Sequence, residues 1–409
     1  MECDVAIVGA GPAGLTLAET VAKEGGDVLL LEEHPEVGVP PHCTGKLSVT
    51  ALNELDLDEK GVLHRVRGAV FYPPSLTPVT ITRDGAQALI FDRKILDQTL
   101  ATKAVDAGAK LYTHSRAKTF SIKPGGITLR FEQQGTLYDV KCRLIVGADG
   151  AASHTARLAG LYSKKPSEIR IGVQREVSGV HIVHGMVELY FGRTWSPGFF
   201  AWMVPTGNDT ARVGLAVQPN APHPASEYLD AFMEAHPVAR EKLGGYRVLK
   251  QSTHILPTGG VLPRTVSDGV LIVGDAAGQV KSTTGGGLYY GMACAKIAGA
   301  AISKALQASP DPLLRRQGLM SYEAAWRAKF GREIAFSVRA RAFLDSLSDS
   351  EVDYLFNIIR RDASLTRQIE VDGDIDHQSQ VGLTLLRHVK YVVKRPRLLF
   401  KLRKFFSLP

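Results

Sequence analysis

The sequence predicts an α/β protein: a doubly wound, largely parallel sheet, interrupted by an antiparallel β-sheet domain and followed by a C-terminal helical region. The chain opens with a short apolar run at 5–8, a glycine-rich turn, a helical stretch at 13–23 and a second apolar run at 28–31. Parallel strands need a crossover of this kind, so the segment indicates a parallel sheet. Residues 165–255 instead carry alternating, aromatic-bearing segments, which are typical of an antiparallel sheet.

The remaining elements extend this pattern. Residues 93–107 and 287–306 have helical spacing, and 144–147 and 270–273 are apolar runs of the buried-strand type. The stretch 69–85 is rich in Pro and Thr and is predicted to be a short β excursion. We therefore expect three parts: a discontinuous α/β domain of residues 1–68, 86–164 and 256–319, a β-rich domain of 69–85 and 165–255, and a helical region of 320–409.

Composition limits the class of protein. Of the 409 residues, 22% are charged and 44% are hydrophobic, which is ordinary for a globular chain and excludes a disordered or collagen-like one. The four cysteines lie far apart without a CxxC pair and the histidines show no ligand spacing, so we expect neither a disulfide framework nor a metal site. No signal-peptide pattern opens the chain, and no apolar run reaches the roughly 20 residues of a membrane span. We therefore expect a cytoplasmic protein.

The net charge of +8 is concentrated at the C-terminus. Residues 382–409 carry eight Lys or Arg and no Asp or Glu, which leaves 41 basic and 41 acidic residues in the rest of the chain. A neutral body excludes an extended nucleic-acid-binding face. Two interpretations of the tail stay open: peripheral contact with anionic lipid at the inner face of the cell membrane, or packing on its own domain. Either interpretation uses one apolar helical face, formed by Leu398, Leu399, Leu402, Phe405 and Phe406.

Residues 9–14, GAGPAG, form a GxGxxG pattern directly between a predicted strand and a predicted helix. The first glycine of this pattern allows a tight turn, the second lets the backbone approach a pyrophosphate, and the third allows close packing. The helix N-terminus then offers free N–H groups to the phosphates, and an acid at the end of the next strand can accept hydrogen bonds from a ribose. The predicted contacts of this dinucleotide site are Gly9, Gly11, Pro12, Ala13, Gly14 and Glu32.

Further glycine-rich segments favour FAD over NAD as the dinucleotide. GADG at 147–150 and GDAAG at 274–278 each end a predicted strand, and TGGG at 284–287 opens a helix. An acid at the carboxyl end of a strand can bind the polyol that links the isoalloxazine to phosphate, and three glycines bring backbone N–H groups close to the ring. An NAD site needs no such second apparatus. The predicted FAD contacts here are Asp149, Asp275, Gly285, Gly286 and Gly287.

These motifs, together with Arg93-x-x-x-Asp97, resemble the FAD-binding set of the para-hydroxybenzoate hydroxylase superfamily. Within it, GDAAGQVKSTTGGGLYYGM at 274–292 is similar to the geranylgeranyl reductase family, especially its archaeal members, although that family usually has Pro in place of Ser282. The resemblance implies a Rossmann-like FAD-binding domain, an FAD contact at Arg93 and a reductase that saturates isoprenoid C=C bonds. It also implies a prenyl lipid substrate, most directly the geranylgeranyl chains of archaeal ether phospholipids. The electron donor stays open among NAD(P)H, reduced ferredoxin and reduced deazaflavin.

Residues 197–205, PGFFAWMVP, resemble the PxxYxWxFP signature that this family associates with its prenyl-binding cavity. The segment departs from the signature twice, at Phe200 and at Val204, and both residues remain apolar. Because alternate residues of a strand share a face, we expect Phe200, Trp202 and Val204 to line one wall of a cavity. The alternative is that these side chains fill the core between two sheets.

The resemblance also implies that the turn PPHCTG at 40–45, with Cys43 and Gly45, faces the flavin. Reduction of an isolated alkene needs hydride from the flavin and a proton at the other carbon. Cys43, with His42 beside it, is a candidate for proton delivery or for orienting the ring, and the alternative is an inert thiol. Tyr289 and Tyr290, just after the glycines, are the other candidate donors.

Two other activities of the same fold are the alternatives. An aromatic hydroxylase needs oxygen and a polar pocket for a small substrate. A flavin-dependent halogenase uses a related WxWxIP segment, whose first Trp is Phe200 here.

Overall fold

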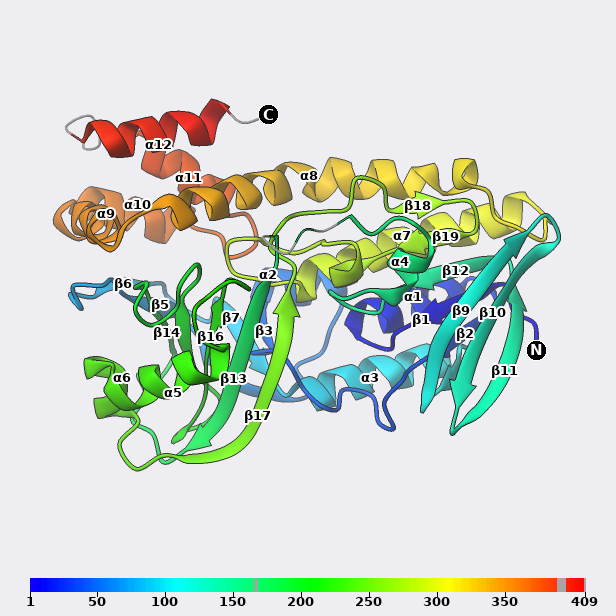
Figure 1. The fold of residues 1–409 in the computed structure, drawn as a ribbon, viewed down its shortest axis with the longest axis horizontal. Helices are drawn as coiled ribbons and strands as arrows, with labels where there is room; N and C mark the ends of the chain where they lie inside the picture. The colour runs from blue at the N-terminus through cyan, green and yellow to red at the C-terminus, as the bar shows by residue number, and fades with distance from the viewer. Residues whose placement is uncertain (164, 166–167, 388–394, 408–409) are drawn as a thin grey trace.

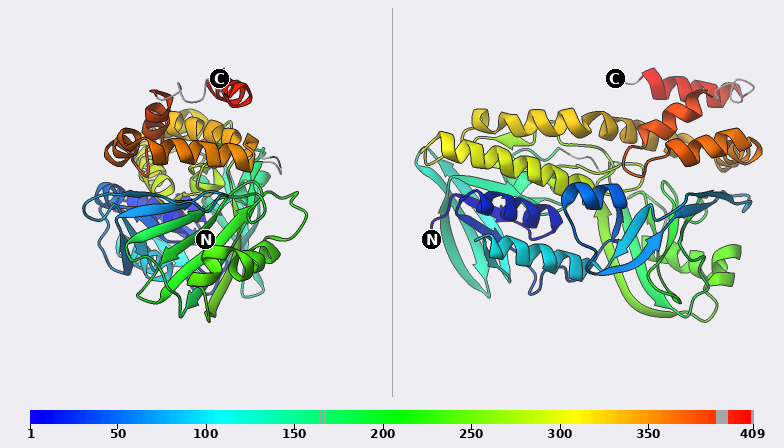
Figure 2. Two further views of the ribbon diagram at one scale, coloured as in Figure 1. Left: turned by 90° about the vertical axis from the view of Figure 1, so that its left-hand side faces the viewer. Right: turned by 180° about the vertical axis from the view of Figure 1, so that it is seen from behind.

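The computed structural model describes residues 1–163, 165, 168–387 and 395–407. Its α/β part and its large antiparallel sheet lie side by side along the long axis of the molecule, and α7 and α8 run beside the α/β part (Figure 1). The remaining helices of the C-terminal region lie over the antiparallel sheet, with α12 outermost (Figures 1 and 2). These helices are α7 Leu288–Ala308, α8 Arg316–Ser346, α9 Asp349–Arg361, α10 Ala363–Asp372, α11 Ser379–Arg387 and α12 Pro396–Ser407.

The α/β part is built on a six-stranded sheet of order β18-β19-β12-β1-β2-β8, parallel except for β18. The four apolar runs predicted as its strands are all present, so the predicted α/β fold is confirmed. The strands are β1 Val5–Val8, β2 Val28–Leu31, β8 Lys110–Tyr112, β12 Leu144–Gly147, β18 Val266–Ser267 and β19 Val270–Ile272. The helices beside them are α1 Pro12–Lys23, α2 Val49–Leu55, α3 Arg93–Asp106 and α4 His154–Leu158, with a single 3-10 turn, η2, at Gly274–Ala276.

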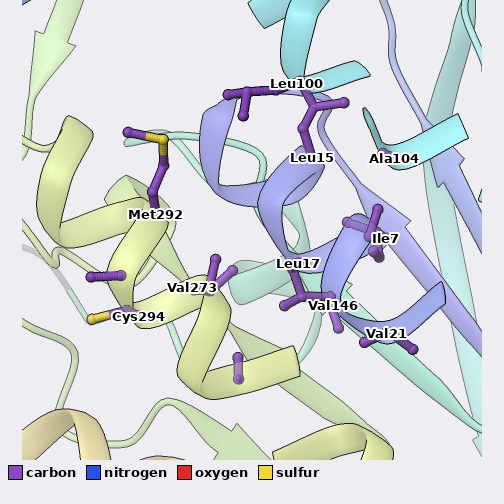
Figure 3. Close-up of a cluster of buried hydrophobic side chains, with 14 of the residues drawn as sticks. Ile7, Leu15, Leu17, Val21, Leu100, Ala104, Val146, Val273, Met292 and Cys294 are labelled. Atoms are coloured by element: carbon purple, nitrogen blue, oxygen red, sulfur yellow. The ribbon is translucent and has the colours of Figure 1, made fainter. Parts of the chain in front are cut away.

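The two faces of this sheet are covered by different layers, because side chains alternate along each strand. Val5 and Ile7 of β1 belong to the cluster formed with α1, α3 and α7, part of which is drawn in Figure 3. Ala6 and Val8 pack against a three-stranded antiparallel sheet. This second sheet was not predicted, because its strands are rich in exposed polar residues. They are β9 Ser115–Lys123, β10 Gly126–Gln133 and β11 Thr136–Cys142.

The large sheet has seven strands in the order β17-β13-β16-β15-β14-β5-β6 and is antiparallel except for the parallel pair of β14 and β5. β5 and β6 come from the Pro- and Thr-rich stretch, and β5 pairs with β14. This pairing supports grouping 69–85 with 165–255 in one domain. The strands are β5 Gly68–Tyr72, β6 Val79–Thr82, β13 Arg170–Ser178, β14 Met186–Tyr190, β15 Ala201–Pro205, β16 Thr210–Val217 and β17 Arg247–Leu256, and α5 Ala225–Ala235 and α6 Pro237–Lys242 follow β16.

A small antiparallel sheet of order β3-β7-β4 was also not predicted. Ile90 of β7 packs in a cluster with side chains of the seven-stranded sheet, while Leu47 of β3 and Phe91 of β7 belong to the α/β core. The small sheet therefore connects the two larger parts. Its strands are β3 Lys46–Ser48, β4 Val62–Val66 and β7 Ala88–Phe91.

The C-terminal helix α12 packs on its own domain. Leu398 is buried with Leu347, and Phe405 contacts the rings of Phe336 and Phe343. Four residues of the face predicted to be apolar, Leu398, Leu399, Leu402 and Phe405, thus pack against α8 and the start of α9, while Phe400 is 70% exposed. Positions 388–394 and 408–409 of the basic tail lie outside the described residues. In the part of the chain that is described, no helix is long and apolar enough to span a bilayer.

Replacing Trp326 tests how far α8 stabilises the α/β part. Trp326 is fully buried, and its indole N–H donates to Oγ1 of Thr265 at 3.2 Å. Trp326→Ala is expected to lower the free energy of unfolding by about 3–5 kcal/mol, measured by chemical denaturation. Met320→Ala, at an exposed position of the same helix, is the control and should cost under about 0.5 kcal/mol. Equal effects of the two variants would contradict this packing.

Candidate functional site

The turn after β1 brings strand and helix into direct contact. Gly9 has a φ of +102°, and a Cβ atom there would overlap the carbonyl oxygen of Ala148. A Cβ atom on Gly14 would overlap the carbonyl oxygen of Gly9. Both positions therefore exclude a side chain, as predicted from the pattern.

Gly11 differs, because a Cβ atom added to it would meet no atom within 4 Å. It is the N-cap of α1, Pro12 follows it, and no side chain caps the first N–H groups of the helix. Open space, free N–H donors and the positive end of a helix thus lie together at Gly11 and Ala13. This arrangement fits the pyrophosphate of a dinucleotide.

Glu32 closes the other side of the turn. Its Oε2 accepts from the backbone N–H of Ala10 at 2.9 Å, and its Oε1 accepts from the backbone N–H of His34 at 3.0 Å. The Glu32 carboxylate is thereby fixed beside the glycine turn, where the sequence predicts a ribose.

Asp149 has a different environment from the one predicted. Its Oδ1 accepts from Oγ of Ser153 at 2.5 Å, and its Oδ2 accepts from the backbone N–H and hydroxyl of Thr155 at 2.8 and 3.0 Å. These bonds shape the loop that begins α4. Asp149 therefore shapes this loop, and its contact with the cofactor stays a prediction.

Asp275 lies in η2, against the loop that precedes α7. A Cβ atom on Gly287 would overlap its carboxylate, and one on Gly286 would lie 3.2 Å from Cε of Lys281. Gly285 has a φ of +70°. Glycines are thus required where the loop approaches Asp275, and no side chain caps α7 at Gly287. The N-terminus of α7 therefore lies directly beside the Asp275 carboxylate.

Ser282 shows why this chain departs from the usual proline. Its backbone N–H donates to Oγ of Ser337 in α8 at 3.0 Å, a bond that proline cannot make. The departure therefore fixes the loop through a hydrogen bond to α8 instead of through a proline ring.

The Cys43 turn is fixed by an arginine from the antiparallel sheet. Nη1 of Arg212 donates to the carbonyls of Thr44 at 2.8 Å and Phe91 at 2.9 Å. Gly45 has a φ of +72°, and a Cβ atom there would overlap the Phe91 carbonyl. Cys43 itself is half-buried, and its Sγ accepts weakly from the Gly45 N–H at 3.4 Å.

Arg93 opens α3 and pairs with Asp97 at 2.8 Å inside the protein. Burial lowers the pKa of Arg93, but the Asp97 carboxylate and the Cys43 thiol outweigh it and raise that pKa. Burial raises the pKa of Asp97, and Arg93 opposes this shift. Arg93, Asp97 and Cys43 are therefore brought together, as the site prediction requires.

His254 of β17 lies behind this turn, with its ring centroid 6.4 Å from that of His42. Burial, and then the charges of His42 and Arg93, lower the pKa of His254 to about 4. Its Nδ1 is buried and has no hydrogen-bond partner among the described residues. The imidazole is thus neutral near pH 7.

The hydroxyls of Tyr289 and Tyr290, the other candidate donors, are both hydrogen-bonded within the protein. The Tyr289 hydroxyl donates to Oε2 of Glu54 at 2.5 Å, and the Tyr290 hydroxyl donates to the carbonyl of Asp376 at 2.6 Å. Burial raises the pKa of both phenols, and both rings pack on Phe330. Both tyrosines therefore hold α7 in place in this structure, and their role as proton donors stays a prediction.

Trp202 and Val204 share one face of β15, and Phe200, directly before the strand, belongs to the same buried cluster. Ala201 and Met203 face α5 and α6. The Trp202 indole N–H donates to Oε1 of Gln174 at 3.1 Å. The predicted common face is thus present, but all three side chains are themselves buried in a core.

A cavity of about 380 Å³ lies beyond this cluster, between the edge of the seven-stranded sheet and the C-terminal helices. Phe71 and Phe191 form its sheet side, and Val352 and Phe356 of α9 form its helical side. Phe191 joins the two groups, since its ring centroid lies 5.7 Å from that of Phe200 and 5.3 Å from that of Phe356. Of the predicted segment, Pro197, Gly198 and Phe199 line the cavity directly.

Known proteins share this architecture. A family model described as FAD binding domain matches residues 2–329. A digeranylgeranylglycerophospholipid reductase of Methanocaldococcus jannaschii is 33% identical over 97% of this chain and 96% of its own length. The chain belongs to the digeranylgeranylglycerophospholipid reductase family. It is a FAD-dependent oxidoreductase, and its open cradle at Gly11 fits that cofactor.

Solved structures agree with this family. A geranylgeranyl bacteriochlorophyll reductase-like protein from Thermoplasma acidophilum has a TM-score of 0.87 at 25% identity, with 99% of each chain covered. A flavin-dependent brominase has a TM-score of 0.70 at 16% identity, over 97% of this chain and 100% of its own, which is a likeness of fold alone.

Sequence reasoning missed Arg212, Asp376 and His254. Arg212 left a usable signal, because it is a charged residue inside the otherwise apolar strand 210–217. Asp376 and His254 left none, because only the tertiary fold brings them to the site.

Gly11→Ala tests whether Gly11 contributes to FAD binding independently of the stability of the fold. The added methyl group meets no protein atom, so the unfolding temperature of the apoprotein should not change. Affinity for FAD should fall by about tenfold or more, since the methyl occupies the space assigned to the pyrophosphate. FAD fluorescence titration measures this, and Gly318→Ala, in ordinary contact within α8, is the control. An unchanged FAD affinity would remove Gly11 from the site.

Proposed function

We propose that this reductase saturates the C=C bonds of prenyl chains, with the geranylgeranyl chains of archaeal ether phospholipids as its substrates. The apolar cavity between the seven-stranded sheet and α9 is the observation that carries the proposal. The name of the relative from Methanocaldococcus jannaschii supports the same lipid class.

The amphipathic helix α9 indicates that the cavity takes an apolar guest. Its apolar residues recur at helical spacing and line the cavity, yet none of its side chains is fully buried. Each CH₂ group that a guest buries there contributes about 0.8 kcal/mol. A prenyl chain would complete the burial of this face, formed by Val352, Leu355, Phe356 and Ile359.

One arginine links the cavity to the cofactor loop. Arg341 lines the cavity, with its guanidinium 5.1 Å from the centroid of the Phe199 ring. Its Nη1 donates to the carbonyl of Thr283 at 3.3 Å, just before Gly285. A chain in the cavity would therefore extend toward the glycine loop.

These positions indicate which step FAD supplies and which steps the protein supplies. FAD, when bound, supplies hydride chemistry. The protein excludes water with the aromatic cluster around Trp202 and delivers a proton to the second carbon. Cys43 is the proposed group for this delivery, with Arg93 and His42 beside it. The reductant is an external donor of the classes left open by the sequence.

The cavity disfavours an aromatic hydroxylase, because its apolar walls offer few partners to a small polar substrate. Phe200 in place of the first Trp of the halogenase segment disfavours halogenation. The reductase therefore remains the better supported activity.

Peripheral membrane contact through 382–409 fits a lipid substrate. The apolar face of α12 is already used in packing, so the contact proposed here uses the exposed Phe400 with Arg397 and Arg403. Basic residues near anionic lipid contribute about 1 kcal/mol each.

The activity is tested with the anaerobically reduced flavoprotein and a digeranylgeranylglycerol phospholipid. Flavin reoxidation should accompany product masses that increase in steps of two hydrogens. No reoxidation with several prenyl lipids, together with oxygen-dependent conversion of an aromatic substrate, would replace this proposal by the hydroxylase.

Val352→Trp tests the cavity itself. The indole fills part of the space beside α9, so KM for a geranylgeranyl substrate should rise by about tenfold, as expected when roughly two CH₂ groups lose their contacts. FAD affinity should not change. Val371→Trp, at a position that is 70% exposed, is the control. If KM changes equally in both variants, the cavity is not the substrate site.

A further inference from the structure

Lys46 is a half-buried lysine in β3 whose charge is not balanced by the protein. Among the described residues, its ammonium makes no hydrogen bond or ion pair. Burial, and then the Lys281 ammonium, lower its pKa to about 8, although Asp376 and Cys43 act in the opposite direction. A partly desolvated ammonium without a partner is costly, so it favours an anion that the protein does not supply.

The nearby carboxylate is already engaged. Asp376 pairs through Oδ1 with Lys281 at 2.6 Å and accepts from the Ser48 hydroxyl through Oδ2. Ser48 and Lys46 lie on the same face of β3, while Leu47 between them is in the α/β core. Two ammonium groups therefore share one carboxylate, which leaves one positive charge in excess.

Both lysines lie between the two segments assigned to the cofactor. Lys46 directly follows Gly45, in the turn that carries Cys43. Nζ of Lys281 lies 3.7 Å from the position that a Cβ atom on Gly286 would take. The backbone N–H of Lys281 donates to the Gly286 carbonyl at 3.1 Å. The excess charge thus lies where the flavin ring is assigned, away from the pyrophosphate cradle at Gly11.

We propose that Lys46 is an electrostatic partner of FAD, which stabilises the negative charge that the flavin ring system carries after reduction. Reduction transfers two electrons from the external donor and takes up one proton, so one negative charge remains on the ring system. A positive group beside the ring favours this reduced form over the neutral oxidised form. Lys281 holds Asp376, and Lys46 supplies the charge.

The reduction potential of bound FAD tests this without any lipid, so the result does not depend on the proposed substrate. Lys46→Met removes the charge and keeps the length of the side chain. Its two-electron equilibrium with a reference dye should move about tenfold toward oxidised FAD, a shift of about 30 mV. Lys46→Arg keeps the charge and should restore the wild-type value. Lys60→Met, at an exposed lysine, is the matched control and should have no effect.

Asp376→Asn provides a test of opposite sign. Asp376 raises the pKa of Lys46, so the variant is measured near pH 6, where Lys46 stays protonated. Both ammonium groups are then uncompensated, and the equilibrium should move toward reduced FAD. Circular dichroism and the flavin absorbance spectrum check that each variant is folded and loaded with FAD. If Lys46→Met misfolds, Lys46→Gln, which also removes the charge, takes its place.

Two outcomes would overturn the assignment. An equilibrium in Lys46→Met within about twofold of wild type would show that the charge does not act on the ring. The same result combined with a raised KM for an anionic phospholipid would assign Lys46 to the lipid phosphate instead. Asp376→Asn moving the equilibrium in the same direction as Lys46→Met would also contradict the electrostatic mechanism.

Discussion

The buried ion pair between Lys281 and Asp376 holds together the parts of the molecule that meet at the cofactor site. Lys281 belongs to the glycine loop before α7, and Asp376 comes from the loop between α10 and α11. Ser48 of β3 and Tyr290 of α7 also bond to Asp376. Breaking a buried pair by removing one partner typically costs about 3–5 kcal/mol, because the other charge stays buried. The glycine loop, the small sheet and the C-terminal region therefore depend on one another, although they are far apart in sequence.

The dinucleotide turn could be predicted from the sequence because its glycines recur at a fixed spacing between a strand and a helix. The spacing reveals the requirement at Gly14, which contacts Gly9 of the same turn, but not the neighbour of Gly9, which is Ala148. Buried parallel strands such as Val5–Val8 are equally readable, since their apolar runs are continuous. The strands β9–β11 escaped prediction because one face only is covered, and their exposed polar residues hide the alternation.

The role of a side chain was harder to predict than the strand or loop that carries it, because the role depends on the residue to which the side chain is hydrogen-bonded. Asp149 and Asp275 both end strands in similar motifs, yet Ser153 and Thr155 occupy the carboxylate of Asp149. Tyr290 follows the glycines as a proton donor would, but its hydroxyl is bonded to the Asp376 carbonyl. No spacing rule reveals such partners.

The family resemblance to FAD-binding domains ends at residue 329, and the parts that distinguish this protein lie largely after it. The helical wall of the cavity, the arginine that joins this cavity to the cofactor loop and the carboxylate that fixes Lys281 all come from residues beyond that point. The first 329 residues carry the FAD cradle and the sheet side of the cavity. The FAD cradle alone fits many flavin reactions. A prenyl chain, in contrast, must be enclosed on both sides before water is excluded, and one of those sides is helical. In the proposed function, the C-terminal helices restrict these flavin reactions to one that acts on an apolar chain.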